Sequence, residues 1–387
     1  MLHAWRHHRA HGPRPVPQTE LARWLGITQG QLSRIENGRN RVRDLDKLIR
    51  YARMLAVPAE LLWFDTDDPA PASPPTPHAL RLRNGAVLAP APLEPMLIDS
   101  LQGTLKEYVR TDNVAGPQPL LPIVTQQVKF AARLARTSRG LAQPRLRLMH
   151  ARFAEFLGWL HQDSGNLPEA AAWTSTAARV ARETGNDRLL SYILMRQSNL
   201  ATDAGDPRTT ITLARAALQA APDLPPRQRA MALRQLAYGH ARLGHSADTV
   251  RAIELAKEQA ARSDDNDDDD LTGYCTVEYI AMEAAHCLIE LGRPEQAILA
   301  LEPQLSCWHQ ENRRDLGRGL ALLALAFARI RQPDQALDVA QHALQIVAET
   351  RSTRTELELY RVMRELHASG AHDHAAHLRI ILRNTLA

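Results

Sequence analysis

Apolar residues recur at three- and four-residue intervals in almost every window from about Met96 to the C-terminus of this chain of 387 residues. This spacing is the period of an α-helix with one buried face, whereas a half-buried strand would alternate with a period of two. No segment has the strand pattern, and glycine, proline and asparagine interrupt the helical windows. The pattern therefore predicts an all-α protein whose helices are joined by short turns.

The interruptions are themselves periodic. Landmark residues near the turns follow one another at intervals of 40, 39, 48, 39 and 39 residues; they are Gly165, Gly205, Gly244, Gly292, Arg331 and Gly370. A glycine at such a position can supply the positive φ that ends a helix. The extra length of the third interval is an acidic run, "SDDNDDDD", which we expect to be a solvated loop rather than a calcium site, because its residues do not fall in the EF-hand register.

A small residue follows each landmark by five positions; these residues are Ala170, Thr210, Thr249, Ala297, Ala336 and Ala375. A small side chain there lets the second helix of a hairpin approach the first. The first unit also has Leu157-Gly158 before the turn and Ala177 after it, and with these residues the repeats resemble tetratricopeptide (TPR) repeats. The resemblance is clearest over residues 146–387 and implies an α-solenoid with helices longer than those of the standard repeat of ~34 residues.

A different pattern occupies residues 1–64. Leu21, Ala22 and Leu25 give one apolar face, Gly26 marks a tight turn, and Leu32 with Ile35 gives a second face. Further apolar residues follow that would complete a small core: Leu45, Leu48, Ile49, Ala52, Leu55, Leu61 and Leu62. The segment "QTELARWLGITQGQLSRIENGRN" resembles the helix-turn-helix (HTH) of the lambda repressor and Cro-like (XRE) family. The resemblance implies a small five-helix domain that binds double-stranded DNA.

The second helix of this motif would enter the major groove, where each base pair has a distinct donor and acceptor pattern. Gln29 and Arg34 are the preferred base-contacting residues, with Ser33 as a lesser candidate. Thr28 is expected to cap the helix. Gln31 has two possible roles, because Thr28-x-x-Gln31 is also a capping-box pattern in which the Gln side chain returns to the backbone.

Phosphate contacts are expected from Gln18 at the start of the first HTH helix and from Asn37, Arg39 and Arg41 in the following loop. Glu36 resembles the buried acid of the family, for which Arg6 is the best partner. The charge distribution agrees with this role, since residues 1–64 contain eleven Lys or Arg and five Asp or Glu while the whole chain has a net charge of only +4. A cationic N-terminal module suits a polyanionic partner.

A proline-rich stretch separates the two patterns. Five prolines lie in "DTDDPAPASPPTPH", and proline fixes φ and lacks a backbone donor, so this stretch is expected to be a semi-extended spacer. We therefore predict an HTH domain at residues 1–64, a linker at 65–95 and a helical-repeat domain at 96–387.

In the TPR register the first helix of each unit lines a concave surface. The candidates for ligand contact on that surface are Trp159, Tyr192, Met195, Asn199, Arg234, Tyr238, Tyr279, Met282 and His286. Aromatic, amide and thioether groups suit an extended peptide. The alternative is that several of these residues only pack between helices.

Other chemistries have little support in the sequence. The cysteines Cys275, Cys287 and Cys307 have no CxxC spacing. The histidines in "HAWRHHRAH" and "HDHAAH" are better explained as polar helix faces than as metal ligands. Walker, HExxH and GxSxG motifs are absent, so we expect neither an enzyme nor a cofactor or metal. No apolar run approaches the ~18 residues of a membrane span, and we expect a cytoplasmic protein.

Together these features predict a sequence-specific transcriptional regulator that acts as a homodimer. Its HTH would bind the operator, and its repeats would mediate dimerisation and sense an effector, with a peptide as one candidate. The alternative is a TPR interaction scaffold whose basic head binds nucleic acid without selectivity.

Overall fold

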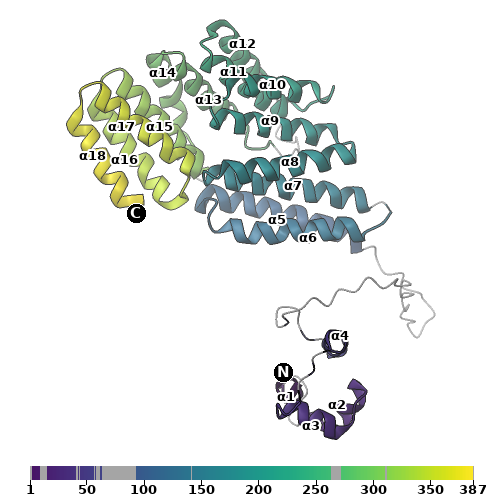
Figure 1. The fold of residues 1–387 in the computed structure, drawn as a ribbon. Coiled ribbons are helices and arrows are strands. Elements are labelled where there is room, and N and C mark those ends of the chain that lie inside the picture. The colour runs from purple at the N-terminus through teal and green to yellow at the C-terminus, as the bar shows by residue number, and fades with distance from the viewer. Residues whose placement is uncertain are drawn as a thin grey trace, which may run out of the picture. The chain divides into compact units, whose positions relative to one another are not determined.

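The computed structural model describes residues 2–8, 15–40, 42, 44–55, 57, 62, 93–140, 142–262, 272–309 and 312–386. Within these residues every regular element is an α-helix (Figure 1). The chain forms two compact units, Met1–Ala89 and Pro90–Ala387. The all-α prediction is confirmed. Most of the predicted linker, residues 65–92, lies outside the described residues, as does the acidic run at 263–270.

The first unit contains α1 (Leu2–Arg6), α2 (Gln18–Leu25), α3 (Gln29–Glu36) and α4 (Leu45–Met54). Its core consists of the expected apolar residues of α2 and α3 together with two residues near the end of α4: Leu21, Ala22, Leu25, Leu32, Tyr51 and Leu55. Leu45 was expected in this core but is 46% exposed, because it is the first residue of α4 and lies outside the buried face. The fifth helix expected around Leu61 lies mostly outside the described residues.

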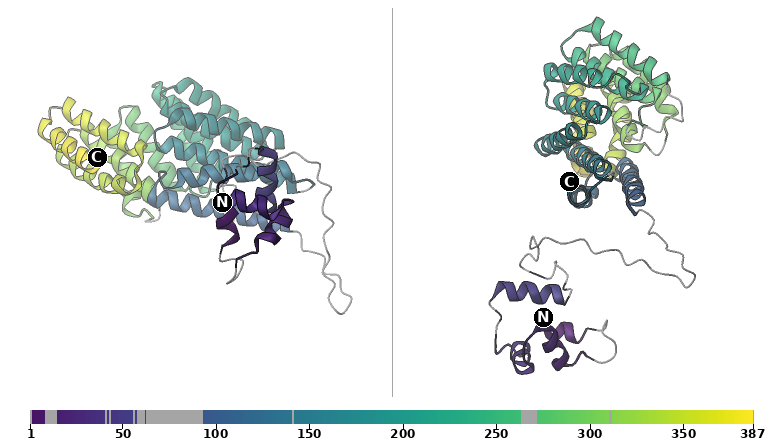
Figure 2. Two further views of the ribbon diagram at one scale, coloured as in Figure 1. Left: turned by 60° about the horizontal axis from the view of Figure 1, so that its bottom comes forward. Right: turned by 90° about the vertical axis from the view of Figure 1, so that its right-hand side faces the viewer.

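The second unit contains fourteen described helices, which Figure 2 shows from two further sides. They are α5 (Leu93–Ala115), α6 (Leu120–Thr137), α7 (Ala142–Asp163), α8 (Leu167–Thr184), α9 (Asp187–Asp203), α10 (Pro207–Gln219), α11 (Pro226–Arg242), α12 (Ser246–Ala261), α13 (Val277–Glu290), α14 (Pro294–Ser306), α15 (Arg313–Arg329), α16 (Pro333–Thr350), α17 (Thr353–Ala368) and α18 (His372–Leu386). From α7 onward, successive helices pack as six hairpins.

The predicted turn landmarks are confirmed. Each of the six has a positive φ, including the non-glycine Arg331 at 59°. The small residues five positions later are buried, and Ala170 is fully buried between α7 and α8. A Cβ built on Gly158 would lie 2.6 Å from Thr174 Oγ1, so this glycine allows the close approach of the two helices. The repeats therefore form by the local rules that their sequence period indicates.

Helix α5 departs from the hairpin pattern. Its main packing partners are α7, α15 and α16, which lie far apart in the chain. Later repeats also meet the earlier ones at the start of α17, where Ser352 Oγ donates to Asp163 Oδ1 at 2.8 Å and Arg354 Nε pairs with Asp203 Oδ2 at 3.0 Å. Consequently the solenoid curls until its fifth and sixth hairpins contact its first and second. No helix among the described residues combines the length and apolar character needed to span a bilayer.

Candidate functional site

The HTH turn is built from backbone geometry at Gly26 and Thr28. Gly26 has φ 67° and donates its N–H to the last carbonyls of α2. Thr28 then begins α3, with its Oγ1 accepting from Gln31 N at 3.2 Å while Gln31 Oε1 accepts from Thr28 N at 2.9 Å. This is the complete capping box. Of the two roles left open for Gln31, capping is the one that the structure shows.

Helix α3 has both buried and exposed side chains. Leu32 is fully buried and Ile35 half-buried, and both lie on the core side. Gln29, Arg34 and Asn37 are exposed, while Ser33 is half-buried and its Oγ accepts from Asn37 Nδ2 at 3.4 Å. The two preferred base-contacting side chains are therefore open to a partner.

A charged cluster ties α1, α2 and α3 together. Arg6 Nε donates to Glu36 Oε1 at 2.9 Å, and Gln18 Nε2 donates to Glu36 Oε2 at 2.6 Å. Burial acts to raise the pKa of Glu36, but the hydrogen bonds from Arg6 and Gln18 outweigh it and hold the pKa below its ordinary value. The predicted Arg6–Glu36 pair is confirmed. Gln18, expected to contact phosphate, instead has its amide engaged with Glu36 in this structure.

Among the remaining phosphate candidates, Arg39 is exposed in the loop after α3. Arg41 lies outside the described residues. DNA contact by these residues stays a prediction.

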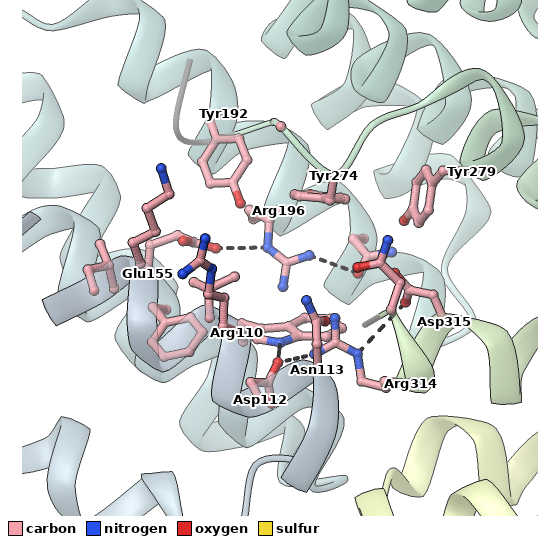
Figure 3. A pocket seen from close by; sticks show the side chains of 18 of the residues that line it. Arg110, Asp112, Asn113, Glu155, Tyr192, Arg196, Tyr274, Tyr279, Arg314 and Asp315 are labelled. Carbon is pink, nitrogen blue, oxygen red and sulfur yellow. Dashed lines mark hydrogen bonds and ion pairs between the residues drawn. The ribbon is translucent and has the colours of Figure 1, made fainter. Parts of the chain in front are cut away.

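In the second unit, a cavity of about 780 Å³ lies on the inner side of the solenoid (Figure 3). Every odd-numbered helix from α5 to α17 contributes to its lining, together with a loop at residues 273–276 and Asn312, whereas no even-numbered helix does. This arrangement follows the expected rule that the first helix of each hairpin faces inward. Helix α5 contributes seven lining residues and covers one side of the cavity.

Trp159 is the centre of a stack of cations. The guanidinium carbons of Arg196 and Arg314 lie 4.5 and 4.6 Å from the centroid of its ring, and that of Arg354 lies 5.4 Å away. Its indole Nε1 donates to Asp112 Oδ2 at 2.8 Å, and Arg314 also pairs with this carboxylate. Because cation–π contacts strengthen when desolvated, this stack fixes the positions of charged groups from α9, α15 and α17 around one ring.

Buried ion pairs hold the other lining cations. Arg196 Nε donates to Glu155 Oε1 at 2.9 Å, and Arg234 pairs with Glu283 at 2.9 Å. Glu283 also accepts from Arg318 at 2.7 Å, so one carboxylate serves two guanidinium groups. Burial raises the pKa of Glu155, whereas Arg318 and Arg234 overcome the effect of burial at Glu283 and lower its pKa.

Some buried polar atoms of the lining have no hydrogen-bond partner among the residues that the structure describes. Asp112 Oδ1 is such an acceptor and Arg234 Nε is such a donor. Burial raises the pKa of Asp112 to about 6, although the neighbouring Arg314 opposes the increase. A buried polar group without a partner costs about 1–3 kcal/mol, so a ligand that bonded these atoms would recover that cost.

The lining carries more positive than negative charge. Seven of its residues are Lys or Arg and three are Asp or Glu, and it also includes three tyrosines and three asparagines. The cavity can therefore hold a polar ligand with a net negative charge, with aromatic rings for its apolar parts and amides for its hydrogen-bonding groups.

Five of the predicted ligand-contacting residues line this cavity: Trp159, Tyr192, Asn199, Arg234 and Tyr279. For four others the expectation of a shared lining is corrected. Met195 and Met282 are buried in the core. Tyr238 forms a 2.7 Å hydrogen bond with His286 Nε2, and His286 also contacts Arg318, so both lie in the buried network behind the lining residue Arg234. The helical register gives the inner face but does not separate its packing positions from its open positions.

Several lining residues escaped the sequence analysis. Asp112 and Arg110 belong to α5, which precedes the repeats, and Tyr274 belongs to an inter-repeat loop. Glu155 and Arg196, on the inner helices, did have a signal in the sequence. Each is a charged residue within an otherwise apolar helix face, and such a position indicates a buried charge.

Residues 2–63 match the family model of a helix-turn-helix domain. No curated protein matches the chain. Solved structures similar to this chain include BtubC (BKLC) from P. vanneervenii, at 17% identity over 60% of this chain and 91% of that chain with a TM-score of 0.43. They also include a Rap protein complexed with competence and sporulation factor, at 11% identity over 74% of this chain and 98% of that chain with a TM-score of 0.44.

A third is the apo form of RapI, at 12% identity over 75% of this chain and 76% of that chain with a TM-score of 0.40. Similarities at this level carry no inference about ligands or partners. The match to the family model makes the first unit a helix-turn-helix domain, and its own six packed hairpins make the second a helical-repeat domain. Membership of the XRE subtype stays a prediction.

Proposed function

We propose that this protein is a sequence-specific, DNA-binding transcriptional regulator with no catalytic role, whose helical-repeat domain binds an effector. The observation that carries the proposal is the exposure of the Gln29 and Arg34 side chains on α3, a helix fixed by the capping box of Thr28 and by the packing of Leu32. A helix of this kind fits the major groove.

Gln29 and Arg34 have complementary chemistry for reading bases. A glutamine amide can bond N6 and N7 of adenine, and an arginine can bond O6 and N7 of guanine. Gln31 is a weaker candidate for base contact, because its side chain would have to break its hydrogen bond with the Thr28 N–H. Arg39 would hold phosphate without reading sequence.

A homodimer is part of the proposal because a single α3 spans only a few base pairs. Two HTH domains would contact two half-sites about 10 base pairs apart, and the symmetry of the operator would mirror that of the dimer.

The effector site is the cavity of the second unit. Its volume lies within the range of ~300–1,000 Å³ that is usual for ligand sites, and it suits a short peptide or a molecule of similar size. Its cationic excess favours a ligand that carries a carboxylate or another anion, and Asp112 Oδ1 and Arg234 Nε offer one buried acceptor and one buried donor. A peptide can satisfy both atoms with one backbone.

Helix α5 gives the effector a route to the DNA-binding domain. It is the helix of the second unit that follows the linker, and it packs on α7, α15 and α16 while lining the cavity. A ligand that binds one position of α5 better than another would shift the population of the two positions. The spacing of two DNA-binding heads, and hence operator affinity, would change with it.

The DNA-binding claim is tested by footprinting on the upstream region of the gene with the double variant Gln29→Ala, Arg34→Ala. We expect a sequence-selective footprint for the wild type and its loss in the variant, because each base contact contributes about 1–3 kcal/mol of discrimination. Arg179→Ala is the matched control, since it removes one exposed cation from α8. Unchanged, selective protection by the double variant would overturn the assignment of α3.

The alternative function is a repeat scaffold with an unselective basic head, which the cationic excess of residues 1–64 favours. Titration with unrelated competitor DNA at several salt concentrations separates the two functions. Unselective binding would be abolished by competitor and would fall with salt equally on every sequence, whereas a regulator would keep a preference for its operator.

A further inference from the structure

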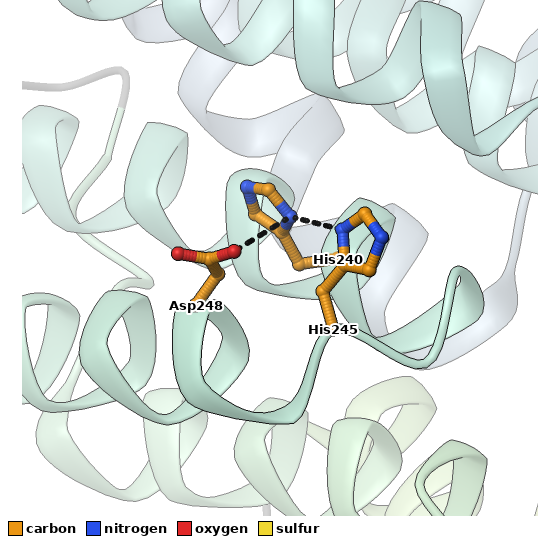
Figure 4. A group of neighbouring side chains, drawn as sticks. All are labelled: His240, His245 and Asp248. Atoms are coloured by element: carbon orange, nitrogen blue, oxygen red, sulfur yellow. Dashed lines mark hydrogen bonds and ion pairs between the residues drawn. The ribbon is translucent and has the colours of Figure 1, made fainter.

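Two histidines and one aspartate meet at the turn between α11 and α12 (Figure 4). None of the three lines the cavity. His240 lies in the last turn of α11, His245 directly precedes α12, and Asp248 is in the first turn of α12. One potential ligand atom from each residue lies within 4.8 Å of the other two. Within the part of the chain that the structure describes, this is the single cluster of three such groups.

The backbone of the turn sets the separation of the two imidazoles. His245 N donates to His240 O at 2.9 Å, and Gly244, with φ 74°, lies between them. The two rings thus lie at the ends of one hydrogen-bonded turn, with their centroids 5.5 Å apart and their planes tilted by 41°. Their Nδ1 atoms are 3.2 Å apart. In a tetrahedral zinc site, two nitrogens at about 2.0–2.1 Å from the metal lie about 3.3 Å apart, so the observed separation is close to that of two zinc ligands. In the structure the two nitrogens share a direct hydrogen bond, which the metal would replace.

Asp248 completes the donor set. Its Oδ2 is 3.9 Å from His240 Nδ1, and its side chain is 64% exposed, so a rotamer change can bring the carboxylate closer. His240 is 7% exposed and fixed in the hairpin, whereas His245 is exposed. One rigid ligand and two accessible ligands leave an open side through which an ion can enter.

We propose that His240, His245 and Asp248 bind a zinc ion, with Nδ1 of each histidine, one carboxylate oxygen and a water molecule as its ligands. Two imidazoles and a carboxylate suit zinc with three protein ligands, and at such a site zinc binds more tightly than Fe²⁺ or Mn²⁺. The ion clamps the α11–α12 hairpin at its turn. This inference does not depend on the proposed DNA-binding function.

A second histidine pair in the same chain provides a control. His367 Nδ1 and His372 Nδ1 are also 3.2 Å apart across the turn between α17 and α18. Among the described residues, however, no third ligand joins this pair in a metal-ligating group. If a close histidine pair alone were sufficient, both turns would bind zinc. The proposal requires that only the turn with Asp248 does so.

The experiment is a titration of the untagged, full-length protein with Zn²⁺ in competition with a chromophoric chelator. We expect one tightly bound Zn²⁺ per chain for the wild type and for His372→Ala. For His245→Ala we expect an affinity loss greater than the ~10–100-fold that the loss of an outer-shell group costs. Asp248→Asn should weaken binding less, because the amide oxygen remains but its charge is lost.

His245 and Asp248 are exposed, so we expect their variants to remain folded. The test therefore does not depend on a substitution of the buried His240. Binding of Co²⁺ to the wild type should give the intense visible absorption of a four-coordinate ion. The proposal is overturned if the wild type fails to compete with the chelator. It is also overturned if His245→Ala binds Zn²⁺ as tightly as the wild type, or if His372→Ala loses the ion instead.

Discussion

The two units of this protein differ in where their candidate functional residues lie, which is on the exposed surface of the first unit and in the interior of the second. In the HTH domain, α3 has Leu32 in the core and turns Gln29 and Arg34 outward. In the helical-repeat domain, charged residues such as Glu155 and Arg196 are more than 90% buried and line a cavity. The candidate residues of the first domain thus form part of its surface, whereas those of the second line an interior cavity.

This difference determines how each domain is held together. One partly buried cluster, Arg6, Gln18 and Glu36, joins three short helices of the HTH domain. Around the cavity several buried ion pairs join helices that are far apart in the chain, such as Asp112 with Arg314 and Glu155 with Arg196. The exposed Gln29 and Arg34 can therefore be changed with little structural cost, whereas the charged residues of the cavity lining also stabilise the fold.

The largest expected effect comes from breaking a cavity ion pair. Arg196→Met leaves Glu155 buried without its partner and should lower the free energy of unfolding of the helical-repeat domain by about 3–5 kcal/mol. Arg179→Met removes an arginine from an exposed pair with Glu183 and should change it by less than about 1 kcal/mol. Urea denaturation measures both. Equal effects of the two substitutions would contradict the contrast between interior and surface charges.

Asp112 should give the helical-repeat domain an unusual pH dependence. Its pKa is raised from 3.8 to about 6 in the folded chain, so its contribution to stability is fully present below pH 3.8 and is lost as the pH rises through about 6. A shift of this size corresponds to at most about 3 kcal/mol. In Asp112→Asn this contribution is absent, so the free energy of unfolding of the wild type should fall relative to the variant between pH 4 and pH 7.

Glu36 should have the opposite sign in the HTH domain. Its pKa is lowered, so its contribution is present above the ordinary value of 4.5 and is lost as the pH falls through the lowered pKa. Hydrogen exchange followed by mass spectrometry can separate the two domains at each pH. For each acid, the wild type is compared with its variant, Asp112→Asn or Glu36→Gln. If the difference in free energy of unfolding changed in the same direction with pH for both acids, their pKa shifts would not be opposite.

A smaller effect tests the packing of the repeats. Gly158→Ala places a methyl group 2.6 Å from Thr174 Oγ1 and 3.2 Å from the backbone oxygen of Ala170, and should lower the free energy of unfolding by about 1–3 kcal/mol. Gly103→Ala in α5 meets no atom within 4 Å and should instead raise it by about 0.5–1 kcal/mol. Thermal denaturation of both variants provides the measurement, and a stabilised Gly158→Ala would refute the close approach of α7 and α8.

The smallest effect concerns the start of α3. Thr28→Ala removes the cap and should destabilise the HTH domain by about 1 kcal/mol, while it frees Gln31 from its bond to Thr28. Thr19→Ala, at an exposed position of α2, should change stability by no more than about 0.5 kcal/mol. Hydrogen exchange of the α3 amides reports the change. Equal protection in Thr28→Ala and the wild type would show that the cap is dispensable.

The sequence predicts most of the fold because its signals are local. The positive φ of the six turn landmarks, the burial of Ala170 and the cap at Thr28 each depend on residues within a few positions of one another. The Arg6–Glu36 pair is a longer-range contact, and it was found through a family resemblance rather than through spacing.

The cavity could be predicted only in part because its residues come together through curvature. Trp159 and Arg234 follow from the repeat register, but Asp112 reaches Trp159 only because α5 packs on α7, α15 and α16. No period in the sequence encodes that packing. The register also places Met195 and His286 on the inner helices without showing that they are buried.

Genome-wide mapping of binding sites tests the central claim, that α3 reads a specific operator, most directly. The wild type and the Gln29→Ala, Arg34→Ala variant would be mapped under the same conditions. The account predicts a small set of discrete sites with related half-sites about 10 base pairs apart, and their loss in the variant. Diffuse binding along the chromosome by the wild type, or an unchanged set of sites in the variant, would contradict it.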